Sequence, residues 1–103
     1  MGFIIIYITH KNMQDARKIG KYLLNKRLIA CVNYFPIKSS FWWKNKIENS
    51  NEIVSLVKTK KANWKKVEME IKKIHPYKTP CVMKFEVKAN KGYEDWINRE
   101  TRS

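Results

Sequence analysis

The sequence predicts an α+β fold: a ferredoxin-like βαββαβ sandwich with a long hairpin between its second and third strands and a short C-terminal helix. Three observations support this prediction. Residues 3–8 form an apolar run rich in isoleucine, residues 12–24 and 63–74 show helical periodicity, and the other long segments have strand character. A chain of 103 residues is the size of one domain, so we expect a single domain over residues 1–103.

The predicted strands differ in how many of their faces are apolar. The first strand places Phe3, Ile5 and Tyr7 on one face and isoleucines on the other. Residues 29–43 and 47–60 form the second and third strands, and a proline at position 36 indicates an edge strand or a bulge. In the fourth strand, over residues 81–88, only one face is apolar. These patterns place the first and third strands in the centre of the sheet and the second and fourth at its edges.

Both main helices begin and end at recognisable signals. Asn12 is a predicted N-cap, and the apolar stripe that follows indicates an amphipathic helix of about four turns. The second helix starts near Asn63 and must stop by His75, because Pro76 disfavours a helical residue before it. Aromatic residues at helical spacing after Asn90 predict the short terminal helix.

Two features of the strands require a partner. The first strand is apolar on both faces, although the two main helices can cover only one face of such a sheet. The second and third strands run for about 14 residues, or roughly 45 Å, whereas a helix of that length spans only about 21 Å. The hairpin therefore extends beyond its own domain, with Trp42 and Trp43 near its tip. We expect a neighbouring copy to bury at least one of these two side chains.

The composition restricts the classes of function. A net charge of +13 indicates either attraction to an anionic partner such as nucleic acid or solvation by lysine; we favour solvation, because the lysines are spread over every segment. No segment is long and apolar enough for a membrane span. Cys31 and Cys81 are too few for a disulfide framework and lack the spacing of a metal or redox motif. We expect a cytoplasmic protein that makes no use of a membrane.

A family resemblance is carried by short motifs spread over nearly the whole chain. Residues 27–33 (RLIACVN) resemble an RLAACVN signature, and residues 41–48 (FWWKNKIE) resemble a YWWxGKIE hairpin. Residues 58–59 (KT), 75–80 (HPYKTP) and 93–97 (YEDWI) resemble KT, HPYExP and YxxWI segments. Together these motifs, in this order, are similar to those of the CutA family of divalent-cation tolerance proteins.

The resemblance implies a homotrimer built like the PII signalling proteins and a role in tolerance of copper or another divalent cation. Cys31 and His75 are the predicted metal ligands, because thiolate and imidazole suit copper and zinc. The other predicted ligand-binding residues, expected in a cleft between subunits or along the hairpin, are Trp42, Trp43, Glu48, Lys58 and Tyr77.

Some positions depart from the family pattern. Lys44 and Lys78 stand where glutamate is usual, and a cation in place of a carboxylate weakens the binding of a divalent ion nearby. Asn45 replaces a glycine, a mild change because asparagine tolerates positive φ in a turn. His10 has no counterpart in the pattern, and we expect it at the surface.

Other functions stay open at this point. The first alternative is a PII-like trimer that binds a small ligand or signals without metal. A basic RNA-binding domain is the weaker alternative, because residues 47–60 lack the stacking aromatic residues of an RNA recognition motif. We do not expect an enzyme, since no nucleophile, base and orienting residue form a defensible set.

Overall fold

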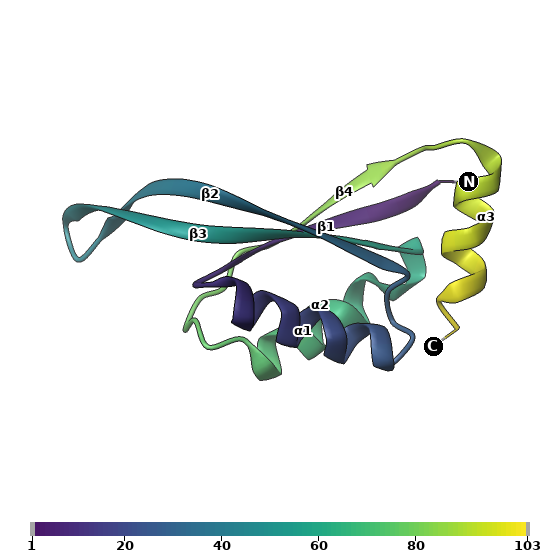
Figure 1. The fold of residues 1–103 in the computed structure, drawn as a ribbon, viewed down its shortest axis with the longest axis horizontal. Coiled ribbons are helices and arrows are strands. Elements are labelled where there is room, and N and C mark those ends of the chain that lie inside the picture. The colour runs from purple at the N-terminus through teal and green to yellow at the C-terminus, as the bar shows by residue number, and fades with distance from the viewer. Residues whose placement is uncertain (1, 103) are drawn as a thin grey trace.

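The computed structural model describes residues 2–102 (Figure 1). The chain runs through β1 (Phe3–His10), α1 (Met13–Asn25), β2 (Cys31–Trp43) and β3 (Lys46–Thr59), then a single 3-10 turn. It continues through α2 (Trp64–Ile74), β4 (Val82–Val87) and α3 (Lys91–Glu100). The predicted βαββαβ order with a terminal helix is confirmed.

The strands form one antiparallel sheet in the order β2-β3-β1-β4. The apolar β1 is therefore central, while β2 and the half-polar β4 lie at the edges, as the face patterns predicted. Pro36 lies on the edge strand β2 and pairs with Ile53 in an unbroken register. Its missing N–H thus faces no second neighbouring strand.

Helices α1 and α2 cover one face of the sheet, and α3 packs at one end of it (Figure 1). The covered face of β1 presents Ile4, Ile6 and Ile8, each with 0% of its surface exposed. The helices pack their own apolar stripes on these isoleucines, chiefly with Ile19, Leu23, Val67 and Ile71. Each buried side chain of this size contributes about 1.5–3 kcal/mol, so this interface holds the domain together.

The sequence signals at the helix ends act as predicted. The Asn12 side chain accepts a hydrogen bond of 2.8 Å from the Asp15 backbone N–H, which caps α1. Helix α2 ends at Ile74, and His75 already has extended backbone geometry before Pro76. These two ends matter for function because the segments that leave them border the site described below.

The hairpin of β2 and β3 is long and regular. Its register runs from Cys31 opposite Lys58 to Trp43 opposite Lys46. Lys44 and Asn45 form the two-residue turn with φ of 49° and 64°, the left-handed geometry of a type I′ turn. The predicted extension beyond the domain is confirmed: the hairpin projects past the helices at the left of Figure 1, and the molecule is 45 Å long.

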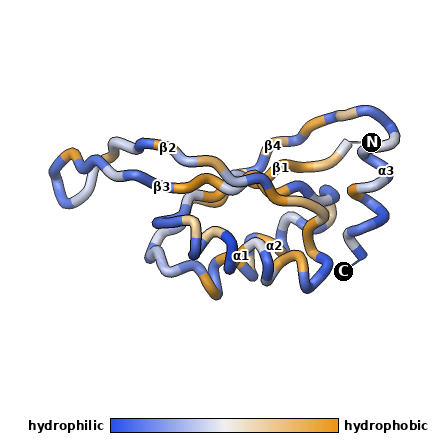
Figure 2. Tube along the Cα trace, viewed as in Figure 1, coloured by the Kyte–Doolittle hydropathy of each residue, from blue (hydrophilic) through white to orange (hydrophobic). Residues whose placement is uncertain are grey.

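The tip of this hairpin leaves aromatic side chains in solvent. Trp42 is 72% exposed and Trp43 54% exposed, and Phe41 and Ile47 beside them are also exposed. Figure 2 shows a short hydrophobic segment on each strand near the tip, on either side of the hydrophilic turn, and these segments are separated from the hydrophobic centre of the sheet by a hydrophilic stretch of hairpin. A patch of this kind on a projecting arm is typical of an interaction surface.

The second face of the sheet is covered only towards its two ends, where Val54 is buried at one and Phe3 at the other. Phe3 is buried there by α3, with its ring 6.0 Å from that of Tyr93. Further along, Met83 and Phe85 of β4 are about half exposed on this face. We call it the open face. No helix among the described residues is long and apolar enough to cross a membrane.

Candidate ligand site on the open face

A cavity of about 670 Å³ lies where the hairpin leaves the body of the domain. It collects residues from the end of β1, from both hairpin strands and from the loop between α2 and β4. The lining residues are Thr9, Ser39, Ser40, Phe41, Trp43, Ser50, Glu52, Tyr77, Lys78, Thr79 and Cys81. Aromatic rings, hydroxyl groups and one carboxylate thus surround a space that suits a small ligand.

Glu52 and Tyr77 form the polar centre of this cavity. The Tyr77 hydroxyl donates a hydrogen bond of 2.8 Å to Glu52 Oε2. Burial, followed by this bond to a carboxylate, raises the pKa of Tyr77 above its ordinary value. The phenol therefore stays protonated, and the bond ties the α2–β4 loop to the base of the hairpin.

Cys81 lies beside this pair and is half-buried. Burial, with a smaller effect of the Glu52 charge, raises the pKa of the Cys81 thiol. The thiol is consequently neutral at neutral pH unless a cation displaces its proton.

His75 holds the loop that carries Tyr77. One ring nitrogen, Nε2, lies 2.8 Å from the Thr9 carbonyl oxygen and donates to it, because a carbonyl can only accept. The other, Nδ1, accepts a 3.1 Å hydrogen bond from the Tyr77 backbone N–H. Both nitrogens of this predicted metal ligand are thus engaged, and a metal ion would have to displace one of these bonds.

The expectation that His10 lies at the surface is wrong. His10 is 0% exposed, its Nε2 lies 2.7 Å from Ser55 Oγ, and its ring stacks on His75 at 5.4 Å. Strand β1 extends two residues beyond the apolar run, so alternation places His10 on the helix-covered face with Ile8. Burial, followed by the His75 charge, lowers the pKa of His10 to about 4. Its Nδ1 has no hydrogen-bond partner among the described residues.

Cys31 and Lys58 form a second cluster at the other end of the open face. The register of the hairpin sets them directly opposite each other. Lys58 Nζ lies 3.3 Å from the Tyr93 hydroxyl and 5.5 Å from the centre of its ring. From Lys58 to Glu52, six residues along β3, is roughly 20 Å. The structure therefore joins Cys31 with Lys58 but leaves both far from the cavity.

The remaining predicted residues lie near the hairpin tip, on its two different faces. Trp43 lines the cavity, while Trp42, one position away, points to the opposite face of the hairpin. Glu48 pairs with Phe41 on the open face and is exposed. Of the predicted ligand-binding residues, Trp43 and Tyr77 are brought together in the cavity.

Sequence reasoning missed Glu52 and Cys81 as site residues. A signal for Glu52 was present: a two-residue turn at Lys44 and Asn45 fixes the hairpin register, which sets Glu52 on the same face as Trp43. Nothing in the sequence indicated that Cys81 would join them, because its place depends on the path of the α2–β4 loop. Among residues 2–102, no three His, Cys, Asp or Glu side chains converge to hold a metal ion.

Comparisons with known proteins agree with one another over nearly the whole chain. A family model described as CutA1 divalent ion tolerance protein matches residues 4–100. The divalent-cation tolerance protein CutA of Archaeoglobus fulgidus is 45% identical over 94 residues, which are 90% of this chain and 92% of that protein. The CutA protein of Pyrococcus horikoshii is 36% identical over 100 residues, which are 96% of this chain and 98% of that protein.

Solved structures show the same fold. The structure of the periplasmic divalent cation tolerance protein CutA from Archaeoglobus fulgidus has a TM-score of 0.95 at 42% identity, covering 97% of this chain and 99% of that one. CutA1 from Pyrococcus horikoshii has a TM-score of 0.94 at 35% identity, with 97% and 99% covered. The resemblance inferred from the short motifs is confirmed.

Proposed function

The chain belongs to the CutA1 divalent ion tolerance family, and on this premise we propose that it is a homotrimer that binds copper or another divalent cation between its subunits. One observation carries this proposal. The candidate residues form two clusters at opposite ends of one open face, and only a second copy can bring the Cys31 cluster of one subunit near the cavity of another. Contacts of this head-to-tail kind close into a ring when the rotation permits.

The exposed apolar residues support association of copies. Met83 and Phe85 on the open face and the tryptophans at the hairpin tip leave large apolar surfaces in water. A projecting hairpin that reaches a neighbour's open face would remove both from solvent at about 25 cal/mol per Å². Each copy has both a projecting hairpin and an open face, so the hairpin of one copy can cover the open face of the next.

The donor chemistry supports a soft or borderline cation. Cys31 lies half-buried at the start of the edge strand β2, and Glu52 and Cys81 lie together in the cavity. Thiolates and a carboxylate are ligands of copper and zinc. His75 is already bonded through both ring nitrogens, so we assign direct binding to Cys31 first and to His75 only if its bond to Thr9 or Tyr77 opens. Lys78 beside the cavity opposes a divalent ion.

Native mass spectrometry of the reduced protein, with and without stoichiometric Cu(II), tests the proposal. The expected species is a trimer that takes up a fixed number of ions and loses them in Cys31→Ser. The matched control Cys81→Ser removes the chain's other thiol from the other cluster and shows whether both ends of the face contribute. His75→Gln should keep uptake if His75 only positions the loop. A trimer of the wild-type protein that takes up no copper would overturn the metal part of the proposal.

A second candidate is a trimer that binds a small organic ligand in the same cavity without metal. The aromatic and hydroxyl lining around the Tyr77–Glu52 pair favours it, because such groups fix a ligand by stacking and hydrogen bonding. A trimer free of copper whose Tm rises with members of a small-molecule library, and no longer does so in Tyr77→Phe, would favour this candidate.

We also propose that the protein works in the cytoplasm. Cys31 and Cys81 are both free thiols, a state that a reducing compartment maintains. Rapid alkylation of the protein in its own cells should modify both thiols. A disulfide between copies in those cells would contradict this location.

A further inference from the structure

The outer surface of the α1–α2 layer is strongly basic. Its lysines lie on the side of each helix opposite the buried stripes, which contain Ile19 and Leu23 in α1 and Val67 and Ile71 in α2. We call this surface the basic helix face; it consists of Lys18, Lys21, Lys26, Lys65, Lys66, Lys72 and Lys73.

Few carboxylates balance these charges. Glu70 accepts a hydrogen bond from Tyr22 and forms ion pairs with Lys26 at 3.7 Å and Lys73 at 3.2 Å. Glu68 pairs with Lys72 at 3.4 Å. The other lysines of the face form no ion pair with any described residue: Lys18, Lys21, Lys65 and Lys66. The basic helix face therefore keeps a net positive charge after its own carboxylates are counted.

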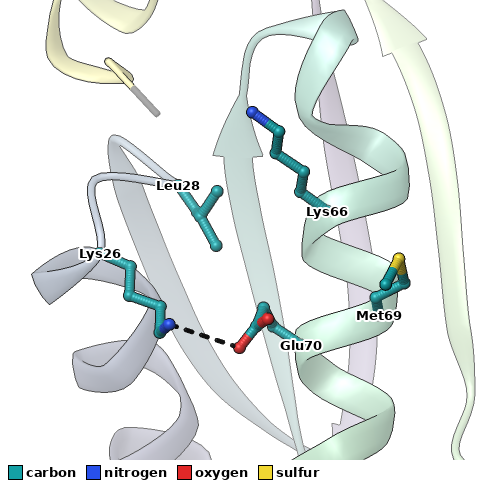
Figure 3. Close-up of a pocket in the computed structure, with 5 residues that line it drawn as sticks. All are labelled: Lys26, Leu28, Lys66, Met69 and Glu70. Atoms are coloured by element: carbon teal, nitrogen blue, oxygen red, sulfur yellow. Dashed lines mark ion pairs between the residues drawn. The ribbon is translucent and has the colours of Figure 1, made fainter.

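One lysine from the end of α1 and one from α2 border a shallow hollow between the helices. Figure 3 shows Lys26 at the end of α1 and Lys66 on α2 on either side of Leu28, with Glu70 below them and Met69 further along α2. The hollow measures about 330 Å³. It lies on the side of the sheet away from the open face, so copies that meet through the open face leave it free.

The chemistry of this face suits phosphate groups better than a lipid surface. Helix α1 has 13 residues and spans about 20 Å, a length over which a nucleic-acid duplex presents several phosphates. Lysine offers point charges that contact phosphates but do not select bases. Met69 is the most exposed large apolar side chain of the two helices at 58%, and Leu24 and Ile74 are exposed to 39% and 36%, which is little apolar surface for insertion into a bilayer interface.

We propose that the basic helix face binds the phosphate backbone of double-stranded nucleic acid without selecting its sequence. This inference is independent of the metal proposal, because it uses the opposite face of the subunit. It also differs from an RNA recognition motif, which would use the sheet. The sequence favoured plain solvation of the charge; the structure adds that four lysines without a carboxylate partner lie together on the outer side of the two helices.

The test is fluorescence anisotropy with a labelled 20-bp DNA duplex of mixed sequence, titrated at several salt concentrations. Four or five phosphate contacts predict a slope of about −4 for log K against log[salt]. The variant Lys18→Gln/Lys21→Gln/Lys65→Gln/Lys66→Gln should bind at least about tenfold more weakly, with a slope nearer −1.

The matched control removes as much charge elsewhere. Lys38→Gln/Lys46→Gln/Lys78→Gln/Lys88→Gln also lowers the net charge from +13 to +9 but alters only exposed residues outside the helix layer. It should change the affinity less than about threefold. Thermal melts confirm that each variant folds, and Lys65→Gln/Lys66→Gln alone serves if the fourfold variant does not.

Three results would overturn the proposal. Equal weakening in both fourfold variants would mean that the charge acts as a whole and not through this face. If the wild-type protein does not bind the duplex at physiological salt, nucleic acid is excluded as the partner. Stronger binding to anionic vesicles than to the duplex, at equal phosphate concentration and with the same dependence on the helix-face lysines, would assign the face to a membrane surface.

Discussion

The two faces of the sheet are made by the same strands but differ in how completely the chain covers them. On the helix-covered face, Ile4, Ile6 and Ile8 are fully buried by the chain's own helices. On the open face, Met83 and Phe85 remain about half exposed, and the hairpin tip beyond them is more exposed still. Both faces are apolar enough to form a core, but this chain completes only one of them.

This difference separates what a single copy needs from what an assembly needs. The covered face supplies the stability of the single chain, so its residues should matter at any protein concentration. If copies cover the open face, its residues should matter through association, and their effect should depend on concentration.

The largest effect is expected for Ile6→Ala on the covered face. Removal of a fully buried isoleucine side chain costs about 2–5 kcal/mol, because the cavity cannot refill. Urea unfolding measures this loss. The matched control is Ile5→Ala, the same change one residue away on the partly exposed open face, which should cost clearly less in dilute protein. Equal losses of unfolding free energy for the two variants at all protein concentrations would mean that the two faces contribute alike to stability.

His10, a buried polar residue of the covered face, should cause a loss of stability in acid. Its pKa is about 4 in the folded protein against an ordinary 6.5, so between these values the unfolded chain binds a proton that the folded chain excludes. Stability should fall by about 3 kcal/mol as the pH drops from 6.5 to 4. Urea unfolding across this range measures the loss, and His10→Gln should flatten it.

Two carboxylates also lose stabilisation in acid. Hydrogen bonds lower the pKa values of Glu70 and Glu94 below 4.5, so their stabilisation is lost as the pH falls further through those values. The His10 effect is therefore read between pH 5 and 6.5. A pH dependence there that is unchanged in His10→Gln would contradict the burial of a neutral imidazole.

Phe85→Ala tests the open face. Burial of the exposed half of this ring by a neighbour would contribute about 1–1.5 kcal/mol per chain. The variant should lower the Tm more at low protein concentration than at high concentration, as melts at two concentrations would show. A shift that is independent of concentration would mean that the ring packs only within its own chain.

The smallest effect is expected at the turn of the hairpin. Lys44 has a φ of 49°, a left-handed geometry that asparagine tolerates better than lysine. Lys44→Asn should stabilise the protein by about 0.5 kcal/mol in urea unfolding. Lys78→Asn removes the same charge from an exposed loop position and is the control. Destabilisation by Lys44→Asn would mean that the Lys44 contact with the Trp43 ring outweighs the turn geometry.

The sequence predicted the fold well because its signals were local. The apolar run of β1, the Asn12 cap, Pro76 after α2 and the length of the hairpin each fix an element without knowledge of its neighbours. The strand order followed from the number of apolar faces per strand. The prediction that His10 is exposed was wrong because the last two residues of β1 are polar. Only the pairing with β3 shows that the strand continues through them.

The site was harder to predict, since it depends on contacts between distant segments. The pairing of Cys31 with Lys58 and the placement of Trp43 follow from hairpin register. The hydrogen bonds that occupy both nitrogens of His75, and the position of Cys81 beside Glu52, depend on the path of the α2–β4 loop. No periodic pattern encodes that path.

The central claim is that the open face is completed by other copies of the chain. Sedimentation equilibrium of the reduced protein at micromolar concentration tests it most directly. We expect a single species with three times the 12.4 kDa mass of the chain, converted to smaller species by Phe85→Asp. A stable species of 12.4 kDa in the wild-type protein at the same concentration would contradict it.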